Sequence, residues 1–438
     1  MDYVEFKSKT IQIYESRRKF LKTSVIGGIS LFCLASIINN IIKVPGKLKY
    51  NLSLESPVHY FDGEKCFVHA RAGIVPCVGE QGLPRIVMTM NTQDLSGSDV
   101  YRDIYGIYTD DFGENWSTIH KLDNLEPLDE IVDGVPRFVA LSDFYPLWHK
   151  SSKLLLGTGH TVVYTKNWKI APHPRPIHTS YSFYKPENNK WAPWQKMEVP
   201  DPKKFFVFSS GSVQRYDKPD GTILLPIAFR PPEKNIPPDI HSRVTVVHCR
   251  LDDNKLKYVE NGNELFVDDY ESRGLGEASL TFFDNKYFMT IRDDKMGYVA
   301  YSHDGMNFYP IQPWKFDDST DLGNYNTQQH WVTHSEGLFL VYTRRGANND
   351  HVFRHRAPLF IAQVDTEKLC IIRDTEQILV PQRGARLGNF GVTDVSSNET
   401  WVTAAEWMQP KGCERYGSDG SVFIARINWS KPNRLFKE

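Results

Sequence analysis

Short runs of apolar, aromatic and β-branched residues recur along the chain. Four of them are GTILLPIAFR (residues 221–230), RVTVVHCRL (243–251), KYFMTIRDD (286–294) and GLFLVYTRR (337–345). Gly, Asp, Asn and Pro separate the runs, and no long helical period competes with them. Strands at this regular spacing, without a Pro/Ser-rich linker, predict one all-β domain whose blade-like sheets protect one another's edges.

The length of the chain indicates how many blades to expect. A four-stranded blade takes roughly 50 to 60 residues, so residues 46–438 predict a β-propeller of six or seven blades. A propeller binds its ligand at one end of the central channel, where the inner strands of several blades deliver side chains. Candidate site residues are therefore expected to be scattered through the sequence.

The segment YTDDFGENW (108–116) predicts a tight hairpin turn. Asp111 can accept hydrogen bonds from the turn backbone, Gly113 can take a positive φ, and Trp116 can pack under the loop. The spacing resembles the Asp-box that decorates blade hairpins in sialidase-like β-propellers, and a looser copy follows at SHDGMNF (302–308). The motif indicates the fold and carries no chemistry.

The N-terminus carries a targeting pattern. SRRKFLK (16–22) precedes an apolar run at 24–38 that is too short for a comfortable membrane span and fits the core of a signal peptide. The pattern resembles a twin-arginine export signal. We therefore expect residues 1–45 to be a signal or a retained anchor that the twin-arginine export machinery recognises. Residues 46–438 are expected to form a single catalytic propeller in the periplasm.

Charge and cysteine content narrow the classes of ligand. The formal net charge of −1 gives no bulk attraction to nucleic acid or anionic lipid, so nucleic-acid binding is disfavoured. An odd number of cysteines follows the signal and no CxxC pair occurs, which argues against a disulfide framework and leaves room for one bridge or a scattered metal site.

Several arginines stand where inner strands or their loops are expected. Arg71 precedes an apolar run, Glu277 leads a strand and Arg292 ends its return strand, and these positions resemble the arginine and glutamate positions of sialidases. A separate cluster of Arg and His residues lies within residues 328–358. An arginine fork binds a carboxylate in a bidentate manner, so several arginines in one cleft predict an acidic sugar, with or without sulfate. A single arginine can equally form a surface ion pair. The substrate-binding candidates are Arg71, Arg292, Arg344, His330 and Arg354, with Glu277 in support.

One departure weighs against a sialidase. That family uses a tyrosine nucleophile, and this chain has Val392 and Thr393 where the family pattern has Ala-Tyr-Ser. A sialidase also needs a carboxylic acid near the first blade, and by position the acid would be Asp99 or Asp103.

Histidines offer another mechanism. Abstraction of the C5 proton of a uronate needs a base near neutral pKa, a cation at the carboxylate and an acid for the C4 leaving group. Over residues 150–395 the chain resembles the short propeller-fold ulvan lyases and their relatives, which eliminate across C4 and C5 of a uronic acid. The resemblance implies catalytic roles for His160, His178 and Tyr181, with Arg292 as the carboxylate clamp.

The same residues are compatible with other functions. A uronate at the non-reducing end can lose its own 4-hydroxyl as water, which would make the enzyme an oligosaccharide dehydratase, and the Pro-rich loops APHPRPIH (171–178) and RPPEKNIPPDIH (230–241) could close such a pocket. An exo-sialidase and a non-catalytic glycan-binding propeller are the alternatives to elimination. No catalytic metal or required cofactor is expected, and the resemblance implies at most a structural zinc without an assigned ligand set.

Overall fold

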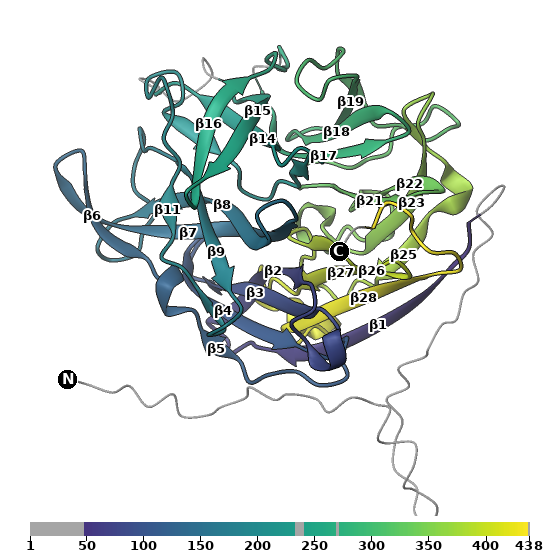
Figure 1. The fold of residues 1–438 in the computed structure, drawn as a ribbon, viewed down its shortest axis with the longest axis horizontal. Coiled ribbons are helices and arrows are strands. Elements are labelled where there is room, and N and C mark those ends of the chain that lie inside the picture. The colour runs from purple at the N-terminus through teal and green to yellow at the C-terminus, as the bar shows by residue number, and fades with distance from the viewer. Residues whose placement is uncertain (1–47, 233–240, 269–270, 437–438) are drawn as a thin grey trace, which may run out of the picture.

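Six antiparallel sheets surround a central axis in the computed structural model, which describes residues 48–232, 241–268 and 271–436 (Figure 1). The predicted all-β propeller is confirmed, with six blades. The twin-arginine segment lies outside the described residues. The described part of the chain contains no helix long and apolar enough to cross a membrane.

The first three blades follow one another along the chain. Blade 1 consists of β2 (Lys65–Val75), β3 (Arg85–Asp94), β4 (Tyr101–Thr109) and β5 (His120–Lys121). Blade 2 consists of β6 (Leu128–Val132), β7 (Val135–His149), β8 (Leu154–Tyr164) and β9 (Thr179–Lys185), with β10 (Lys190–Trp191) and β11 (Gln195–Lys196) both paired to β9. Blade 3 consists of β12 (Val207–Ser209) and β13 (Tyr216–Asp217), both paired to β14 (Ile223–Arg230), then β15 (Arg243–Asp252) and β16 (Lys255–Asn261).

The remaining blades include the strand that closes the ring. Blade 4 consists of β17 (Gly276–Phe283), β18 (Lys286–Arg292), β19 (Tyr298–Ser302) and β20 (Gln312–Pro313). Blade 5 consists of β21 (His330–His334), β22 (Gly337–Tyr342) and β23 (Leu359–Asp365), with β24 (Cys370–Ile371) and β25 (Gln377–Val380) paired to β23. Blade 6 consists of β26 (Gly391–Ser396), β27 (Glu399–Ala405), β28 (Ser421–Trp429) and β1 (Tyr50–His59).

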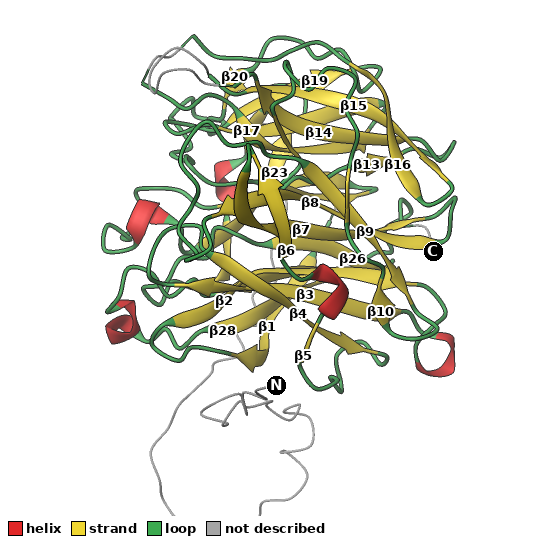
Figure 2. Ribbon diagram, turned by 90° about the vertical axis from the view of Figure 1, so that its left-hand side faces the viewer, coloured by secondary structure: helices red, strands yellow, loops and turns green. Residues whose placement is uncertain are grey.

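Helices in the described chain are single 3₁₀ turns in connecting loops, drawn red in Figure 2. They are η2 (Glu80–Gly82), η3 (Asp123–Leu125), η4 (Phe353–His355), η5 (Arg373–Thr375) and η6 (Cys413–Tyr416).

The inner strands β2, β7, β12, β17, β21 and β26 line the axis. β2 contacts both β7 and β26, and β21 contacts both β17 and β26. Apolar side chains fill the spaces between neighbouring blades; one such layer brings Leu156 and Tyr181 of blade 2 against Phe208 and Ile227 of blade 3. Each sheet is therefore buried on both faces, and blades cannot bury their apolar surface alone.

Two hairpin turns have the geometry that the sequence predicts. In the first, the Gly113 N–H donates to Thr109 Oγ1 at 2.8 Å and the Asn115 N–H donates to Asp111 Oδ1 at 2.9 Å. In the second, at residues 302–308, Ser302 and Asp304 accept the corresponding backbone bonds. The turn glycines have φ of 84° and 79°, a left-handed conformation that favours glycine.

A local irregularity recurs at the entrance of successive blades. His69, Asp143, Ser212, Glu277 and Asn326 come from five different blades or the segments that enter them, and each has a positive φ between 42° and 56°. Register shifts mark β-bulges at three of these points, in β2, β7 and β17. A bulge redirects the side chain of its extra residue, so the repeated feature turns polar side chains toward the axis.

Candidate active site

Asp143 is the centre of a buried polar network. Its Oδ1 lies 3.2 Å from His69 Nε2 and accepts a short hydrogen bond from Ser212, and its Oδ2 lies 3.3 Å from His160 Nε2. Burial alone would raise the pKa of Asp143, but the neighbouring His69, His160 and Arg71 hold it well below its usual range. Asp143 is therefore an ionised acceptor on the channel floor.

Arg71 extends this network across the axis. The side chain is fully buried; Nη2 donates to Ser212 Oγ at 2.7 Å and to Gln328 Oε1 at 3.0 Å, and Nε donates to the Phe390 carbonyl at 3.3 Å. These bonds join blade 1 to blades 3, 5 and 6. Arg71 was predicted to bind the substrate carboxylate, but its burial and its protein partners place it beneath the reach of a ligand at the channel mouth.

The two predicted catalytic histidines lie on opposite faces of blade 2. His160 pairs with Thr179 in the β8–β9 ladder, so His178, the next residue along, points to the other face. His160 contacts Asp143 and, through Nδ1, Ser209 Oγ at 2.6 Å. Burial and the charge of Lys196 lower the pKa of His178 to about 4. A single sugar ring cannot lie between the two imidazoles.

Tyr181 and His330 are also withdrawn from the channel mouth. Tyr181 is 3 % exposed and belongs to the apolar layer between blades 2 and 3, where its hydroxyl donates to Gln195 Oε1 at 3.4 Å. His330 is fully buried; it bonds Ser279 Oγ at 2.7 Å and Gln328 Nε2 at 2.9 Å. Burial, with the charge of Arg71, lowers the pKa of His330 well below its usual value, so it is neutral.

A ring of charged residues lies at the end of the channel where the second strand of each blade connects to the third. Connections of this kind emerge at the same end of a propeller as the segments that enter the inner strands. We call this set the arginine rim: Asp99 of blade 1, Arg175 of blade 2, Arg230 of blade 3, Arg273 and Arg292 of blade 4, Arg354 of blade 5, and Arg386 on the connection into blade 6.

The electrostatics indicate that the rim residues face one another. Burial, and then the charges of Arg273 and Arg292, lower the pKa of Arg354. Burial and Arg354 lower the pKa of Arg386 to about 10. The Asp99 carboxylate acts on Arg354 and Arg386 in the opposite direction. The guanidinium groups therefore repel one another across a shared space, and an anion bound between them would relieve that repulsion.

Blade 4 supplies the most ordered part of the rim. Arg292 Nη1 bonds Glu277, its Nη2 donates to Asn326 Oδ1 at 2.6 Å, and Arg273 Nη2 donates to the same oxygen at 3.2 Å. Arg273 also forms a bidentate pair with Asp294. Glu277 and Arg292, whose positions on one hairpin resemble those of sialidases, thus lie together at the rim, with the guanidinium held in place from two sides.

Arg354 and Arg344 have different surroundings although both belong to the predicted cluster 328–358. Arg354 is half-buried, has a φ of 57°, and rests on the Phe353 ring; among the described residues no carboxylate lies within ion-pair distance of it. Arg344 makes a bidentate pair with Glu376 at 2.8 and 2.6 Å. Arg354 can therefore receive a ligand anion. The predicted binding role of Arg344 is not supported, because its Nε and Nη2 donate to Glu376 and its Nη1 to the Arg345 and Gly346 carbonyls, which leaves no free fork for a carboxylate.

Asp99 and His173 complete the inventory of groups at the rim. Asp99 is exposed, and its Oδ1 accepts a bond from the Tyr101 hydroxyl at 3.0 Å. Asp103, the alternative acid, pairs instead with Lys121 at 3.0 Å on the third strand of blade 1. Burial, and then Arg175 and Arg230, lower the pKa of His173. In the sequence, the only sign of His173 is its place in the Pro-rich loop 171–178.

The position expected for a sialidase nucleophile holds no tyrosine side chain. Val392 and Thr393 of β26 stand there, next to Gly391, where an added Cβ would lie 2.8 Å from Arg71 Cγ. The nearby Tyr145 is buried, and its hydroxyl donates to the Val392 carbonyl at 2.8 Å. Burial raises the pKa of Tyr145 to about 12, so it is a neutral structural group.

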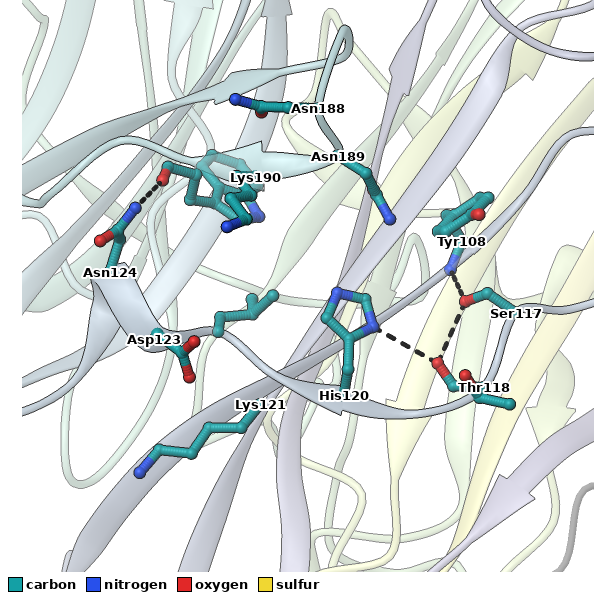
Figure 3. A pocket seen from close by; sticks show the side chains of 12 residues that line it. Tyr108, Ser117, Thr118, His120, Lys121, Asp123, Asn124, Asn188, Asn189 and Lys190 are labelled. Atoms are coloured by element: carbon teal, nitrogen blue, oxygen red, sulfur yellow. Dashed lines mark hydrogen bonds between the residues drawn. The ribbon is translucent and has the colours of Figure 1, made fainter.

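A shallow hollow of about 520 Å³ lies away from the rim, between β4–β5 and the turn that precedes β10 (Figure 3). It is lined by His120, Lys121 and residues 188–190, and His120 Nδ1 bonds the Thr118 carbonyl at 3.3 Å. None of the rim arginines reaches this hollow.

The described residues offer no metal centre. They contain no group of three or more His, Cys, Asp or Glu side chains that could hold an ion. Cys66, Cys249, Cys370 and Cys413 are buried free thiols and Cys77 is an exposed one. The described chain therefore gives the expected structural zinc no ligand set.

The sequence matches no protein-family model and no curated protein. Solved structures match the fold. A protein of unknown function from Dyadobacter fermentans DSM 18053 superposes with a TM-score of 0.57 at 12 % identity, over 88 % of this chain and 100 % of that one. Trypanosoma rangeli sialidase gives 0.53 at 11 % identity, over 88 % of this chain and 60 % of that one.

Two further glycan-processing proteins share the architecture. The Hadza microbial sialidase Hz136 gives a TM-score of 0.53 at 11 % identity, over 82 % of this chain and 65 % of that one. The phage phi92 endosialidase gives 0.52 at 10 % identity, over 90 % and 73 %. The fold is a sialidase-like β-propeller. At these identities the likeness concerns the arrangement of the blades, and the chemistry of this sialidase-like propeller has to be argued from its own residues.

Proposed function

We propose that this protein is an enzyme that acts on an anionic carbohydrate bound at the arginine rim. The observation that carries the proposal is that every blade, or the connection into it, contributes a charged residue to one ring in which arginines outnumber carboxylates. Planar guanidinium forks match carboxylates and sulfates, and groups that repel one another gain most from an anionic ligand. A uronic acid, with or without sulfate, has the required charge.

We propose β-elimination as the reaction. Arg292 and Arg354 would neutralise the uronate carboxylate as negative charge grows at C5. His173 is the base that fits best, because burial and the charges of Arg175 and Arg230 lower its pKa and leave the imidazole neutral at pH 7. The C5 proton passes to His173, its electron pair forms the C4=C5 bond, the C4–O bond breaks, and the departing oxygen takes a proton from solvent.

The leaving group distinguishes two versions of this reaction. Loss of a sugar from C4 cleaves the chain and defines a polysaccharide lyase. Loss of the 4-hydroxyl as water leaves the chain length unchanged and defines an oligosaccharide dehydratase.

Hydrolysis is the second candidate because one observation favours it. Glu277 and Arg292 are paired at the rim, and the exposed Asp99 lies close enough to influence Arg273 and Arg354. This combination resembles part of a sialidase site. Val392 and Thr393 weigh against it, since they stand where the sialidase pattern has its tyrosine nucleophile.

One experiment ranks these functions. Purified residues 46–438 are incubated with sulfated and unsulfated uronate oligosaccharides, ultraviolet absorbance of the C4=C5 double bond is followed, and products are weighed by mass spectrometry. We expect absorbance, and we expect His173→Gln to slow it by about 100-fold with binding retained. His178→Gln is the matched control and should leave the rate unchanged.

The other outcomes are equally decisive. Release of sialic acid from sialosides without absorbance would replace elimination by hydrolysis. Calorimetric binding of the oligosaccharides without any product would reduce the protein to a glycan-binding propeller. Absence of both binding and turnover across the panel would overturn the proposed anionic ligand.

A further inference from the structure

A serine, a histidine and an aspartate form a continuous chain below the rim, at the junction of blades 2 and 3. Ser209 ends β12, and its Oγ lies 2.6 Å from His160 Nδ1. His160 Nε2 lies 3.3 Å from Asp143 Oδ2. Asp143 and His160 come from the paired strands β7 and β8 of blade 2, and Ser209 comes from β12 of blade 3. The spacings of 17 and 49 residues leave no short motif in the sequence.

The protonation states along this chain follow from Asp143. Because the pKa of Asp143 is held well below its usual range, the carboxylate is ionised and can only accept hydrogen bonds. A neutral His160 imidazole is best placed with its N–H on Nε2, the nitrogen that faces Asp143, so that Nδ1 presents its lone pair to Ser209. The Ser209 hydroxyl donates to that lone pair, which is the arrangement that activates a serine for attack.

The surroundings keep the serine in place and accessible. The Gly211 N–H donates to Ser209 Oγ at 3.2 Å. Gly211 also packs against the imidazole so closely that a Cβ there would clash with Nδ1. The His160 side chain is 19 % exposed and Ser209 is partly exposed, so the pair is in contact with solvent.

We propose that Ser209 is a nucleophile and that the protein cleaves acyl esters, such as O-acetyl groups of small alcohols or sugars. Ser209 Oγ bonds to the ester carbonyl carbon while its proton moves to His160 Nδ1 and the carbonyl π pair moves to oxygen. The tetrahedral intermediate collapses, the ester C–O bond breaks, and the alcohol leaves with the proton from His160. Water then repeats the sequence on the acyl-serine and releases the carboxylic acid, with Asp143 ionised throughout.

This activity does not rest on the arginine rim or on elimination. The test treats the purified enzyme with an alkyl fluorophosphonate and maps the labelled peptide by mass spectrometry, and it measures hydrolysis of p-nitrophenyl acetate. We expect one label per chain, on Ser209. We expect His160→Gln and Ser209→Ala to reduce ester hydrolysis by about 100-fold or more, the usual contribution of a general base or nucleophile.

The matched control is Ser210→Ala. Ser210 is the adjacent residue, fully buried, and its hydroxyl donates to the Gly159 carbonyl at 2.7 Å, away from His160. In the Ser210→Ala variant, the rate of Ser209 labelling and the rate of ester hydrolysis should both stay within about twofold of those of the parent protein. Site mapping on the unmutated enzyme keeps the test valid if a variant does not fold. Absence of label from Ser209 in the folded enzyme, or labelling of equal rate in His160→Gln, would overturn the assignment.

Discussion

At the scale of single residues, Arg354 and Arg344 belong to the same cluster in the sequence but should have different roles. Arg354 should contribute to ligand binding and Arg344 to stability. Arg354 has no carboxylate partner among the described residues, and Arg344 is paired with Glu376. We expect Arg354→Ala to weaken binding of a uronate oligosaccharide by about 10- to 100-fold, the value of roughly one charge-assisted hydrogen bond, and to leave stability nearly unchanged.

The control for that experiment is the neighbouring pair. Arg344→Ala leaves the Glu376 carboxylate without its cation, so we expect the free energy of unfolding to fall by about 2 kcal/mol while affinity stays the same. Calorimetry measures the affinity and urea denaturation the stability. Equal losses of affinity in both variants would contradict the assignment of Arg354 to the ligand site.

Replacement of Asp394, on the inner strand of blade 6, should stabilise the protein. Burial raises the pKa of the Asp394 carboxyl to about 6, and the Thr400 hydroxyl donates a hydrogen bond to it. A folded-state pKa above the unfolded value means that ionisation costs stability as the pH rises from about 4 to beyond 6. We expect Asp394→Asn to raise the free energy of unfolding by about 1 kcal/mol at pH 7, a value reduced for partial solvent contact.

The pH dependence checks the sign of that effect. At pH 3.5 the Asp394 carboxyl is largely protonated in both states, so the variant and the parent protein should have the same stability there. Urea unfolding at the two pH values measures the difference. A gain in stability that persists undiminished at low pH would show that charge burial is not its cause.

At the scale of elements, the hairpin turns test how backbone conformation and packing combine. Gly113 has a φ of 84°, and a Cβ there would lie 2.6 Å from Arg426 Nη2. Gly63 has a φ of 89° with nothing within 4 Å of such a Cβ. We expect Gly63→Ala to cost about 1 kcal/mol from strain alone and Gly113→Ala to cost about 1 kcal/mol more, measured by denaturant unfolding. Equal costs would mean that the turn near Arg426 adapts freely.

The strands were predictable because their signal is local. GTILLPIAFR contains β14 (Ile223–Arg230) and KYFMTIRDD contains β18 (Lys286–Arg292), since apolar and β-branched runs between turn residues suit a sheet buried on both faces. The YTDDFGENW turn was predictable for the same reason. Its hydrogen bonds join residues only a few positions apart.

The site was predictable only in part because its geometry is not local. Glu277 and Arg292 were found together because one hairpin carries both, whereas Ser209, the hydroxyl partner of His160, lies on β12 of the next blade. The bulge that aims Asp143 toward the axis has no distinctive residue pattern. His160 and His178 look equivalent in sequence, yet the alternation of a strand sends them to opposite faces.

At the scale of the whole molecule, the ring depends on one pairing between distant parts of the chain. β1 forms the outer strand of blade 6 beside β28, with Tyr50 opposite Trp429, as the adjacent purple and yellow strands in Figure 1 show. Tyr50 is 1 % exposed and packs edge-on against Phe339 and Trp429. The closing strand therefore joins blade 6 to blade 5 as well as completing its own sheet.

Removal of that strand should open the ring. We expect a chain that begins at residue 60 to lose several kcal/mol of stability, because it exposes the β28 edge and the apolar surface that Tyr50 covers, and to aggregate or unfold over a broadened transition. A chain that begins at residue 46 keeps β1 and should melt as the full chain does. Calorimetric melting of both truncations, at matched concentration, decides the point. If the shorter chain melts in the same single transition, the six blades are held together by their inter-blade layers alone, and β1 is an accessory strand rather than the closure.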